Sequence, residues 1–163
     1  MAARLTEDIV QALIRILKSN LPHEITVTNG QNDGDESIDP PKNASYHVAQ
    51  VAGLSLPMVV IDPLEVTFSP ASAEQFVNGD LSIQVIVVSE NVEYERGTRQ
   101  CWRYGVSVYR AIHDQGVISL DGLLHGRCIV TGIKYQDWRV GTNTNVYRRA
   151  AVVQCNVRFH EPF

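Results

Sequence analysis

The spacing of apolar residues changes in the middle of the chain, and this change predicts a strand that leads into a helix. Residues 81–88 form an almost continuous run of β-branched and other apolar side chains, which is typical of a strand buried on both faces. Residues 92–115 instead carry their apolar side chains at helical spacing. Asn91 is a suitable N-cap for this helix, and Gly116 is a common residue just beyond a helix end.

This central helix has a predicted apolar face and a predicted cationic face. The apolar face is expected to consist of Tyr94, Cys101, Gly105, Val108 and Ile112, flanked by Trp102 and Tyr109. We expect Trp102 to pack beneath the helix against residues 83–88, and Gly105 to allow a close approach of the backbones. The nearly opposite face carries Arg96, Arg99, Arg103 and Arg110.

The N-terminal segment predicts a second amphipathic helix, followed by a long polar loop. Apolar residues at helical spacing run from Thr6 to Ser19, and Leu21-Pro22 is expected to end the helix. Residues 24–28 then have the composition of a short strand. Residues 29–44 are rich in Gly, Asn, Asp and Pro, so we expect a loop insert at about 29–45 that is flexible until assembly orders it.

The remaining apolar runs predict strands separated by loops. The predicted strands are residues 46–51, 56–62, 64–69, 127–139 and 147–160. The predicted connections are a loop at 71–79, a linker at 116–126 and a hairpin loop at 141–145. Alternation places Ile129, Thr131, Ile133 and Tyr135 on one face of the first C-terminal strand. It places Ala151, Val153, Cys155, Val157 and Phe159 on one face of the second.

The order of helix, strands, helix and two strands predicts the fold class α+β. We expect a single domain over residues 1–163, in which a mixed, mostly antiparallel β-sheet is packed by an N-terminal helix and a long central helix. No apolar run approaches about 20 residues, so no membrane-spanning segment is predicted. The start of the chain lacks the apolar core of a signal peptide.

Charge is divided unequally along the chain. Residues 1–95 contain 14 acidic and 4 basic residues, whereas residues 96–163 contain 4 acidic and 10 basic residues. The two balances, −10 and +6, give the net charge of −4. Two interpretations stay open: the oppositely charged parts cancel within the fold, or they pair between neighbouring subunits.

The sequence contains no motif that predicts catalysis or cofactor binding. Glycine-rich phosphate loops, HExxH, CxxC and GxSxG are absent. Cys101, Cys128 and Cys155 are widely spaced within apolar patterns, which favours buried free thiols over a metal site or disulfides. The acidic stretch 33–39 alternates oxygen ligands as a calcium loop does, but it lacks the Gly and Glu that an EF-hand needs. We therefore expect no catalytic residues, no cofactor and no bound metal.

The order of the predicted elements carries a resemblance to a known family. Its features are the helix at 9–17, the polar insert, the strand that ends in the acidic turn 87–96, and the long helix with Arg103-Tyr104 and residues 109–112. Two long strands close the chain. In this order the chain resembles the small neck proteins of long-tailed bacteriophages, most closely the tail terminators, or tail-completion proteins. The resemblance covers nearly the whole chain, and the long linker 116–126 is its main departure.

This resemblance implies a structural role. Proteins of that family form a ring, commonly hexameric, on the last ring of the tail tube, where they stop tube growth and join the tail to the filled head. The implied partners are further copies of this chain, a tail tube protein and a head-side neck or connector protein. DNA would pass through the ring without sequence-specific binding. The protein would be assembled in the host cytoplasm and would reside in the tail or neck of the virion.

Other functions stay open beside the tail terminator. One is a head–tail joining or stopper component of the same neck. Another, of a different class, is a small monomeric ligand-binding or enzymatic α+β domain with a site under the helix. A stable ring favours a neck protein, whereas a rigid monomer with a deep pocket of convergent polar groups favours the ligand-binding or enzymatic domain.

For a ring, we predict that opposite charges on neighbouring subunits steer assembly. A ring joins two different surfaces of adjacent subunits, so these surfaces can carry opposite charge without self-repulsion. The candidate interface residues are Arg96, Arg99, Arg103, Arg110, Asp33, Asp35, Glu36 and Asp39.

Overall fold

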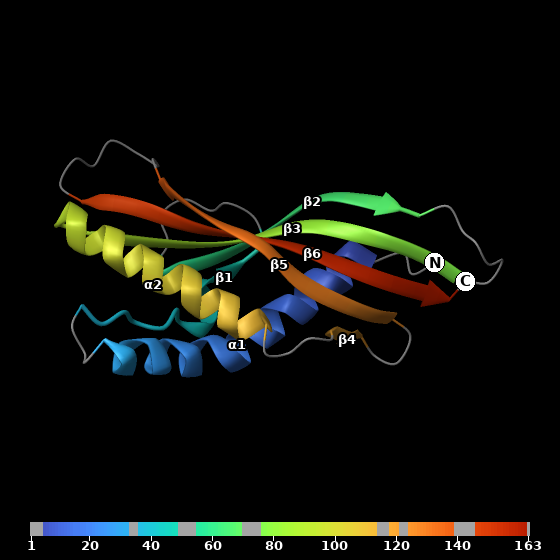
Figure 1. Ribbon diagram of the computed structural model, residues 1–163, viewed down its shortest axis with the longest axis horizontal. Coiled ribbons are helices and arrows are strands. Elements are labelled where there is room, and N and C mark those ends of the chain that lie inside the picture. Colours follow the sequence, from blue (N-terminus) through green and yellow to red (C-terminus); the bar gives the residue numbers. More distant parts are fainter. Residues whose placement is uncertain are drawn as a thin grey trace.

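Two helices and a six-stranded sheet make up the computed structural model, which describes residues 5–32, 36–48, 55–69, 76–113, 118–120, 124–138 and 146–162. The elements in chain order are α1 (Leu5–Gln31), β1 (Tyr46–His47), β2 (Met58–Phe68), β3 (Phe76–Asn91), α2 (Tyr94–His113), β4 (Ile118–Leu120), β5 (Leu124–Asp137) and β6 (Tyr147–Pro162). The strand order is β1-β2-β3-β6-β5-β4, and only β1 and β2 pair in parallel. The predicted α+β fold class is confirmed (Figure 1).

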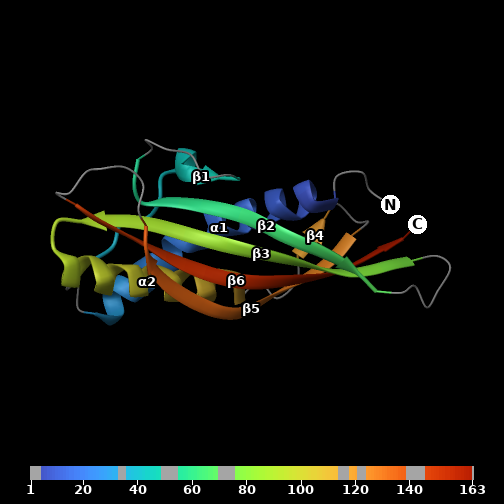
Figure 2. The same cartoon turned by 90° about the horizontal axis from the view of Figure 1, so that it is seen from above.

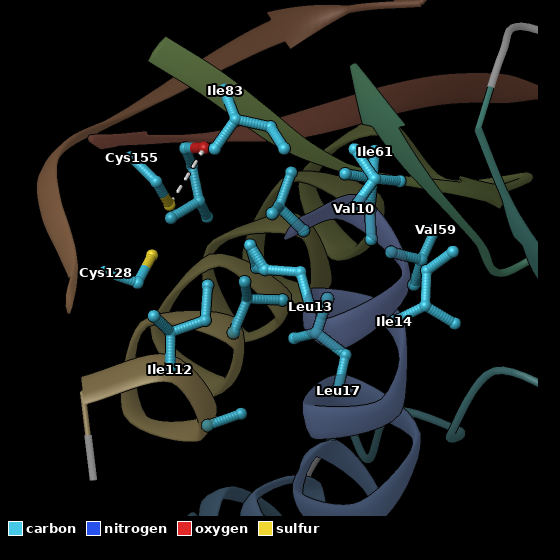
Figure 3. Packing of buried hydrophobic residues seen from close by; sticks show 14 of the residues in the cluster. Val10, Leu13, Ile14, Leu17, Val59, Ile61, Ile83, Ile112, Cys128 and Cys155 are labelled. Carbon is cyan, nitrogen blue, oxygen red and sulfur yellow. Dashed lines mark hydrogen bonds between the residues drawn. The ribbon is translucent and has the colours of Figure 1, made fainter. Parts of the chain in front are cut away.

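Both helices pack on the same face of the sheet (Figure 1). α2 lies along β5 and β6, and α1 crosses obliquely toward β2 (Figure 2). The main core fills the space between them. Leu13 and Leu17 of α1, Ile61 and Ile83 of the sheet, and Ile112 of α2 meet there (Figure 3).

The opposite face of the sheet is buried at one end. A second apolar cluster lies there, consisting of Met58, Val60, Ile86, Val88, Ala150 and Val152, with Leu56 and Trp138 packed against it. Val85 and Val87 belong to the main core, so this part of β3 is buried on both faces, as its apolar run predicted. Beyond this cluster the same face carries polar side chains, among them Gln84 and Arg158.

α1 continues well beyond its predicted end. We predicted that Leu21-Pro22 ends the helix and that residues 24–28 form a strand; both predictions are wrong, because α1 runs to Gln31. Leu21 and Ile25 continue the helical spacing of the apolar face and are 0% and 1% exposed. Burying two such side chains contributes about 3–6 kcal/mol, which offsets the cost of about 3 kcal/mol for a proline inside a helix.

β2 joins two predicted strands into one. Residues 56–62 and 64–69 were expected to be separate because Pro63 lies between them, but the structure has one strand with a register shift between Pro63 and Glu65. A proline cannot donate a hydrogen bond to the sheet, and a bulge removes the need for one at that position.

Two predicted connections contain strands. β3 begins inside the predicted loop 71–79, and β4 lies inside the predicted linker 116–126, where it pairs with β5. β1 covers only the start of the predicted strand 46–51, whose last residues lie outside the described part of the chain. The predicted hairpin loop 141–145 also lies outside it.

The buried face of α2 is displaced from the predicted one. Cys101, Gly105, Val108 and Ile112 are buried as predicted. The prediction is wrong for the aromatic residues, because Tyr94, Trp102 and Tyr109 are 48%, 50% and 38% exposed. The reason is α1, which packs against the other flank of α2, where it contacts the buried Ser107 and Ala111.

Gly105 brings α2 close to β5, as predicted. A Cβ atom at this position would lie 2.8 Å from the Tyr135 hydroxyl oxygen and 3.1 Å from Ile133 Cγ2. Both neighbours are on β5, so the missing side chain sets the spacing between this helix and the sheet.

A bulge at Thr131 interrupts the predicted alternation of β5. Cys128 packs into the main core before the bulge, and Ile133 packs against the same core after it. The prediction of one continuous face is therefore wrong for Ile129, which is 37% exposed. The alternation predicted for β6 is confirmed, because its predicted face is buried: Ala151, Val153, Cys155, Val157 and Phe159.

Candidate functional site

Part of the predicted loop insert is a packed segment that lies along α2. The Arg99 guanidinium donates two hydrogen bonds to the Glu36 carboxylate, one of them 2.5 Å from Nε to Oε2. Arg103 Nη1 donates to the Glu36 carbonyl oxygen at 2.6 Å. The Tyr104 hydroxyl donates to the Asp39 carbonyl oxygen at 2.7 Å. One face of α2 therefore holds residues 36–39 through both side-chain and backbone atoms.

The same segment is fastened to the end of α1. Asn29 donates through Nδ2 to the Ile38 carbonyl oxygen and accepts through Oδ1 from the Ile38 amide, both at 2.9 Å. Ile38 is 3% exposed and belongs to the main core. We expected this insert to be flexible until assembly; instead, its described part is anchored by one buried isoleucine and by hydrogen bonds. Ile38, the only large apolar residue of the insert, was the sequence signal for this packing.

The electrostatics of this contact favour the ionised carboxylate. Its hydrogen bond with Arg99 is the largest cause that lowers the pKa of Glu36, and the nearby Arg103 and Arg96 add to it. The segment therefore joins an acidic part of the chain to its most cationic helix. This contact supports the interpretation that some of the opposite charges cancel within the fold.

Several of the predicted interface residues already make contacts within their own chain. Arg99 and Arg103 contact Glu36 of the same chain, and Arg110 Nη1 donates to Gln31 Oε1 at 2.9 Å. Arg96 is exposed on the same helix, while Asp33 and Asp35 lie outside the described residues. Asp39 is bound through its carbonyl oxygen. The structure thus pairs one acidic member of the set, Glu36, with Arg99 and Arg103 inside one subunit, and charge contacts between subunits stay a prediction.

A shallow pocket of about 250 Å³ adjoins the held segment. Residues 37–39, Leu56, Pro57, residues 89–91, Gln100 and Tyr104 line it. Burial is the main cause that raises the pKa of Tyr104, so its hydroxyl stays protonated at neutral pH and is engaged with a backbone oxygen. Neither a histidine nor a cysteine is among these lining residues.

The three cysteines are buried free thiols, as predicted. Burial raises the pKa of Cys101 to about 11, in spite of the nearby Arg149. Contact with Cys128 and burial raise the pKa of Cys155, and both side chains point into the core (Figure 3). Cys101 and Cys155 are therefore protonated at neutral pH and are poor nucleophiles. The part of the chain that the structure describes holds no group of three or more potential metal ligands.

The outer flank of α2 exposes an apolar stripe, which includes Trp102 and Tyr109, two residues that were predicted to flank the buried face. Trp102, Val106 and Tyr109 are 50%, 37% and 38% exposed and follow one another at helical spacing. The Tyr109 ring packs on the His113 ring at 5.3 Å between centroids. Their i, i+4, i+7 spacing was visible in the sequence, but only the position of α1 decides which flank stays open. No described helix is long and apolar enough to cross a membrane.

The comparisons with known proteins give likenesses only among solved structures. No protein family model matches this chain, and no curated protein matches it. Among solved structures, a chain described as "Virion of native gene transfer agent (GTA) particle" is similar with a TM-score of 0.36 and 14% sequence identity. The match covers 71% of this chain and 80% of that chain. At this TM-score and identity, the likeness carries no argument about function.

Proposed function

We propose that this protein is a structural neck protein of a long-tailed phage or phage-like particle, and specifically a tail terminator. The chain would act as a single domain, and its copies would form a ring, most simply a hexamer. The ring would cap the tail tube, bind a head-side connector protein and let DNA pass through without sequence-specific contacts. Its place would be the tail or neck of the virion.

The observation that supports this proposal is the order and packing of the elements. An N-terminal helix, a paired set of strands, a long helix entered through an acidic turn, and two long closing strands follow one another as the resemblance implies. Both helices pack on the same face of the sheet, so the two edges of the sheet, β1–β2 on one side and β5–β4 on the other, are left for contacts. A subunit with two unlike sides suits the head-to-tail contacts of a ring.

The mass of the protein in solution, alone and with tail tubes, tests this proposal. Light scattering should give a mass close to six times that of the 18.1 kDa chain, or a monomer that assembles on the ends of added tail tubes. A protein that stays at 18.1 kDa at every concentration and leaves tube ends bare would refute it.

A monomeric ligand-binding domain is the second candidate, and the 250 Å³ pocket is the observation in its favour. Asp39 and Glu90 both line this pocket, and Glu90 pairs with Arg148 at 3.2 Å, so a small cationic ligand would compete with Arg148 for the Glu90 carboxylate. Calorimetric titration with small organic cations tests it. Micromolar binding that Glu90→Gln abolishes, by a protein that remains monomeric, would favour this function over the ring.

A further inference from the structure

The sheet has two open edges on opposite sides. β4 pairs only with residues 124–126 of β5, so no described strand pairs with the outer edge of β5 from Arg127 to Asp137. On the other side, β1 pairs only with Val59 and Val60 of β2. The outer edge of β2 from residue 61 to 68, which is interrupted by Pro63 and its bulge, likewise has no strand partner in the described chain. Exposed strand edges are templates for pairing with another chain.

The two open edges lie at the same height, meaning the same position along the strand direction as the cross-strand register gives it. The pairing register leads from Ile61 of β2 across β3 and β6 to Ile133 of β5, and from Phe68 to Gly126. The open stretch of β2 therefore spans the same height as residues 126–133 of β5. Strand direction alternates from β2 through β3 and β6 to β5, so β2 and β5 run in opposite directions. A neighbour in the same orientation would bring them together as an antiparallel pair.

The charges on these two edges are complementary. Asp62 and Glu65 of β2 lie on the sheet face that points away from the helices, opposite Gln84 and Ser82 of β3. Arg127 and Lys134 of β5 lie on the same face, and both are exposed.

Their heights also agree. Through the register, Asp62 is level with Gly132 of β5, and Glu65 is level with Ile129. Both carboxylates thus fall between the heights of Arg127 and Lys134. In a neighbour placed edge to edge, two anionic side chains would meet two cationic ones on one face.

Apolar surface is exposed on the same two sides. Leu64 and Phe68 of β2 are 56% and 53% exposed. On the β5 side, the outer flank of α2 exposes Trp102, Val106 and Tyr109. This flank adjoins β5, because the Tyr135 hydroxyl donates to the Trp102 carbonyl oxygen at 3.4 Å. Each side therefore combines an open strand edge and exposed apolar side chains with two charged residues at matching heights, acidic on β2 and basic on β5.

We infer that a second copy of this chain docks head-to-tail, with the β2 edge of one subunit against the β5 edge and the outer flank of α2 of the next. This inference deepens the proposed ring and rests on it. Because the two surfaces differ, each bound subunit leaves the same two surfaces open for the next one. Because the two surfaces lie at the same height, the contact needs no shift along the strands from one subunit to the next, which a closed ring requires.

Two charge-reversal variants test this interface. The first carries Asp62→Lys and Glu65→Lys, and the second carries Arg127→Glu and Lys134→Glu. Each variant alone would place like charges across every contact, so each should stay monomeric under conditions in which the wild type assembles. Mixed in equal amounts, they should assemble again, because every contact between the two variants then joins opposite charges.

Light scattering measures the outcome, and a matched control keeps it interpretable. Glu7→Lys with Asp8→Lys makes the same charge change on exposed positions of α1 and should assemble as the wild type does. Circular dichroism checks that each variant folds; where a double variant does not, the single changes Glu65→Lys and Lys134→Glu replace it.

Three results would overturn the inference, and they separate it from the proposed function. If the reversed variants assemble alone, or if their mixture stays monomeric while the wild type forms rings, the interface lies elsewhere and the ring function stands. If the wild type forms no ring even on tail tubes, the proposed function and the inference fail together.

Discussion

Gly79 lies where the sheet has no room for a side chain, and Gly79→Ala should therefore destabilise the protein. It sits in β3 between Phe68 of β2 and Phe159 of β6. A Cβ atom there would lie 2.4 Å from Phe159 Cζ and 2.6 Å from the Thr67 carbonyl oxygen. Phe159 is only 3% exposed and packs edge-on against Phe68 at 6.2 Å between centroids, so its ring has little freedom to withdraw.

The expected loss follows from two opposing effects. Overpacking costs about 1–3 kcal/mol, whereas replacing glycine by alanine gains about 0.4–1 kcal/mol by restricting the unfolded chain. The Thr67 oxygen can move only if β2 moves relative to β3, so we place the cost in the upper half of its range. The net loss in the free energy of unfolding should be about 2 kcal/mol.

Urea denaturation followed by circular dichroism measures this loss. Gly30→Ala is the control, because nothing lies within 4 Å of a Cβ at that position in α1, and it should leave stability unchanged or slightly raised. In a Phe159→Leu background, which removes the nearest ring atoms, Gly79→Ala should cost less than in the wild type. A loss below about 0.5 kcal/mol in the wild-type background would show that the close approach is not real.

The other predictions concern the helices and the held segment. Thr28 Oγ1 and Ser107 Oγ lie 2.8 Å apart in the buried contact of α1 with α2, so Thr28→Val should lower the free energy of unfolding by about 1–3 kcal/mol. The double change with Ser107→Ala should cost less than the sum of the two single changes, and additive losses in a denaturation cycle would refute the hydrogen bond. Trp102→Ala should cost less than about 1 kcal/mol because the ring is half exposed, and a loss of about 3–5 kcal/mol in the same assay would place it in the core. The pKa of Glu36 is lowered in the fold, so its contribution to folding stability is complete above the ordinary pKa of 4.5 and is lost as the pH falls through the lower folded value. Glu36→Gln should therefore weaken the loss of stability in acid, and an unchanged pH profile of stability would mean that the bond between Glu36 and Arg99 is absent.

The sequence predicted the fold class because long elements leave strong periodic signals. The run 81–88 and the alternation of residues 151–159 each correspond to a strand with the expected buried face. The prediction failed where local chemistry competes with tertiary burial. A proline inside a helix or strand lacks the backbone N–H that these elements need, so Pro22 and Pro63 were expected to end them. Instead, the burial of Ile25 keeps α1 intact and a bulge keeps β2 continuous.

The candidate surfaces were less accessible to sequence reasoning. A helical wheel shows that Trp102 and Tyr104 lie on different flanks of α2, but it does not show which flank meets α1. The choice depends on a contact between elements far apart in the chain. The bond between Glu36 and Arg99 likewise joins residues 63 positions apart. The sequence shows an acidic segment and a row of arginines, but only the fold shows that they meet within one subunit.

Electron microscopy of particles made without this protein tests the proposed role most directly. If the protein is a tail terminator, deletion of its gene should leave filled heads that are separate from tails. The tails should also grow to irregular, extended lengths. A stopper would instead leave tails of normal length and heads that lose their DNA. Intact particles whose attached tails have the wild-type length would contradict the assignment of this protein to the end of the tail tube.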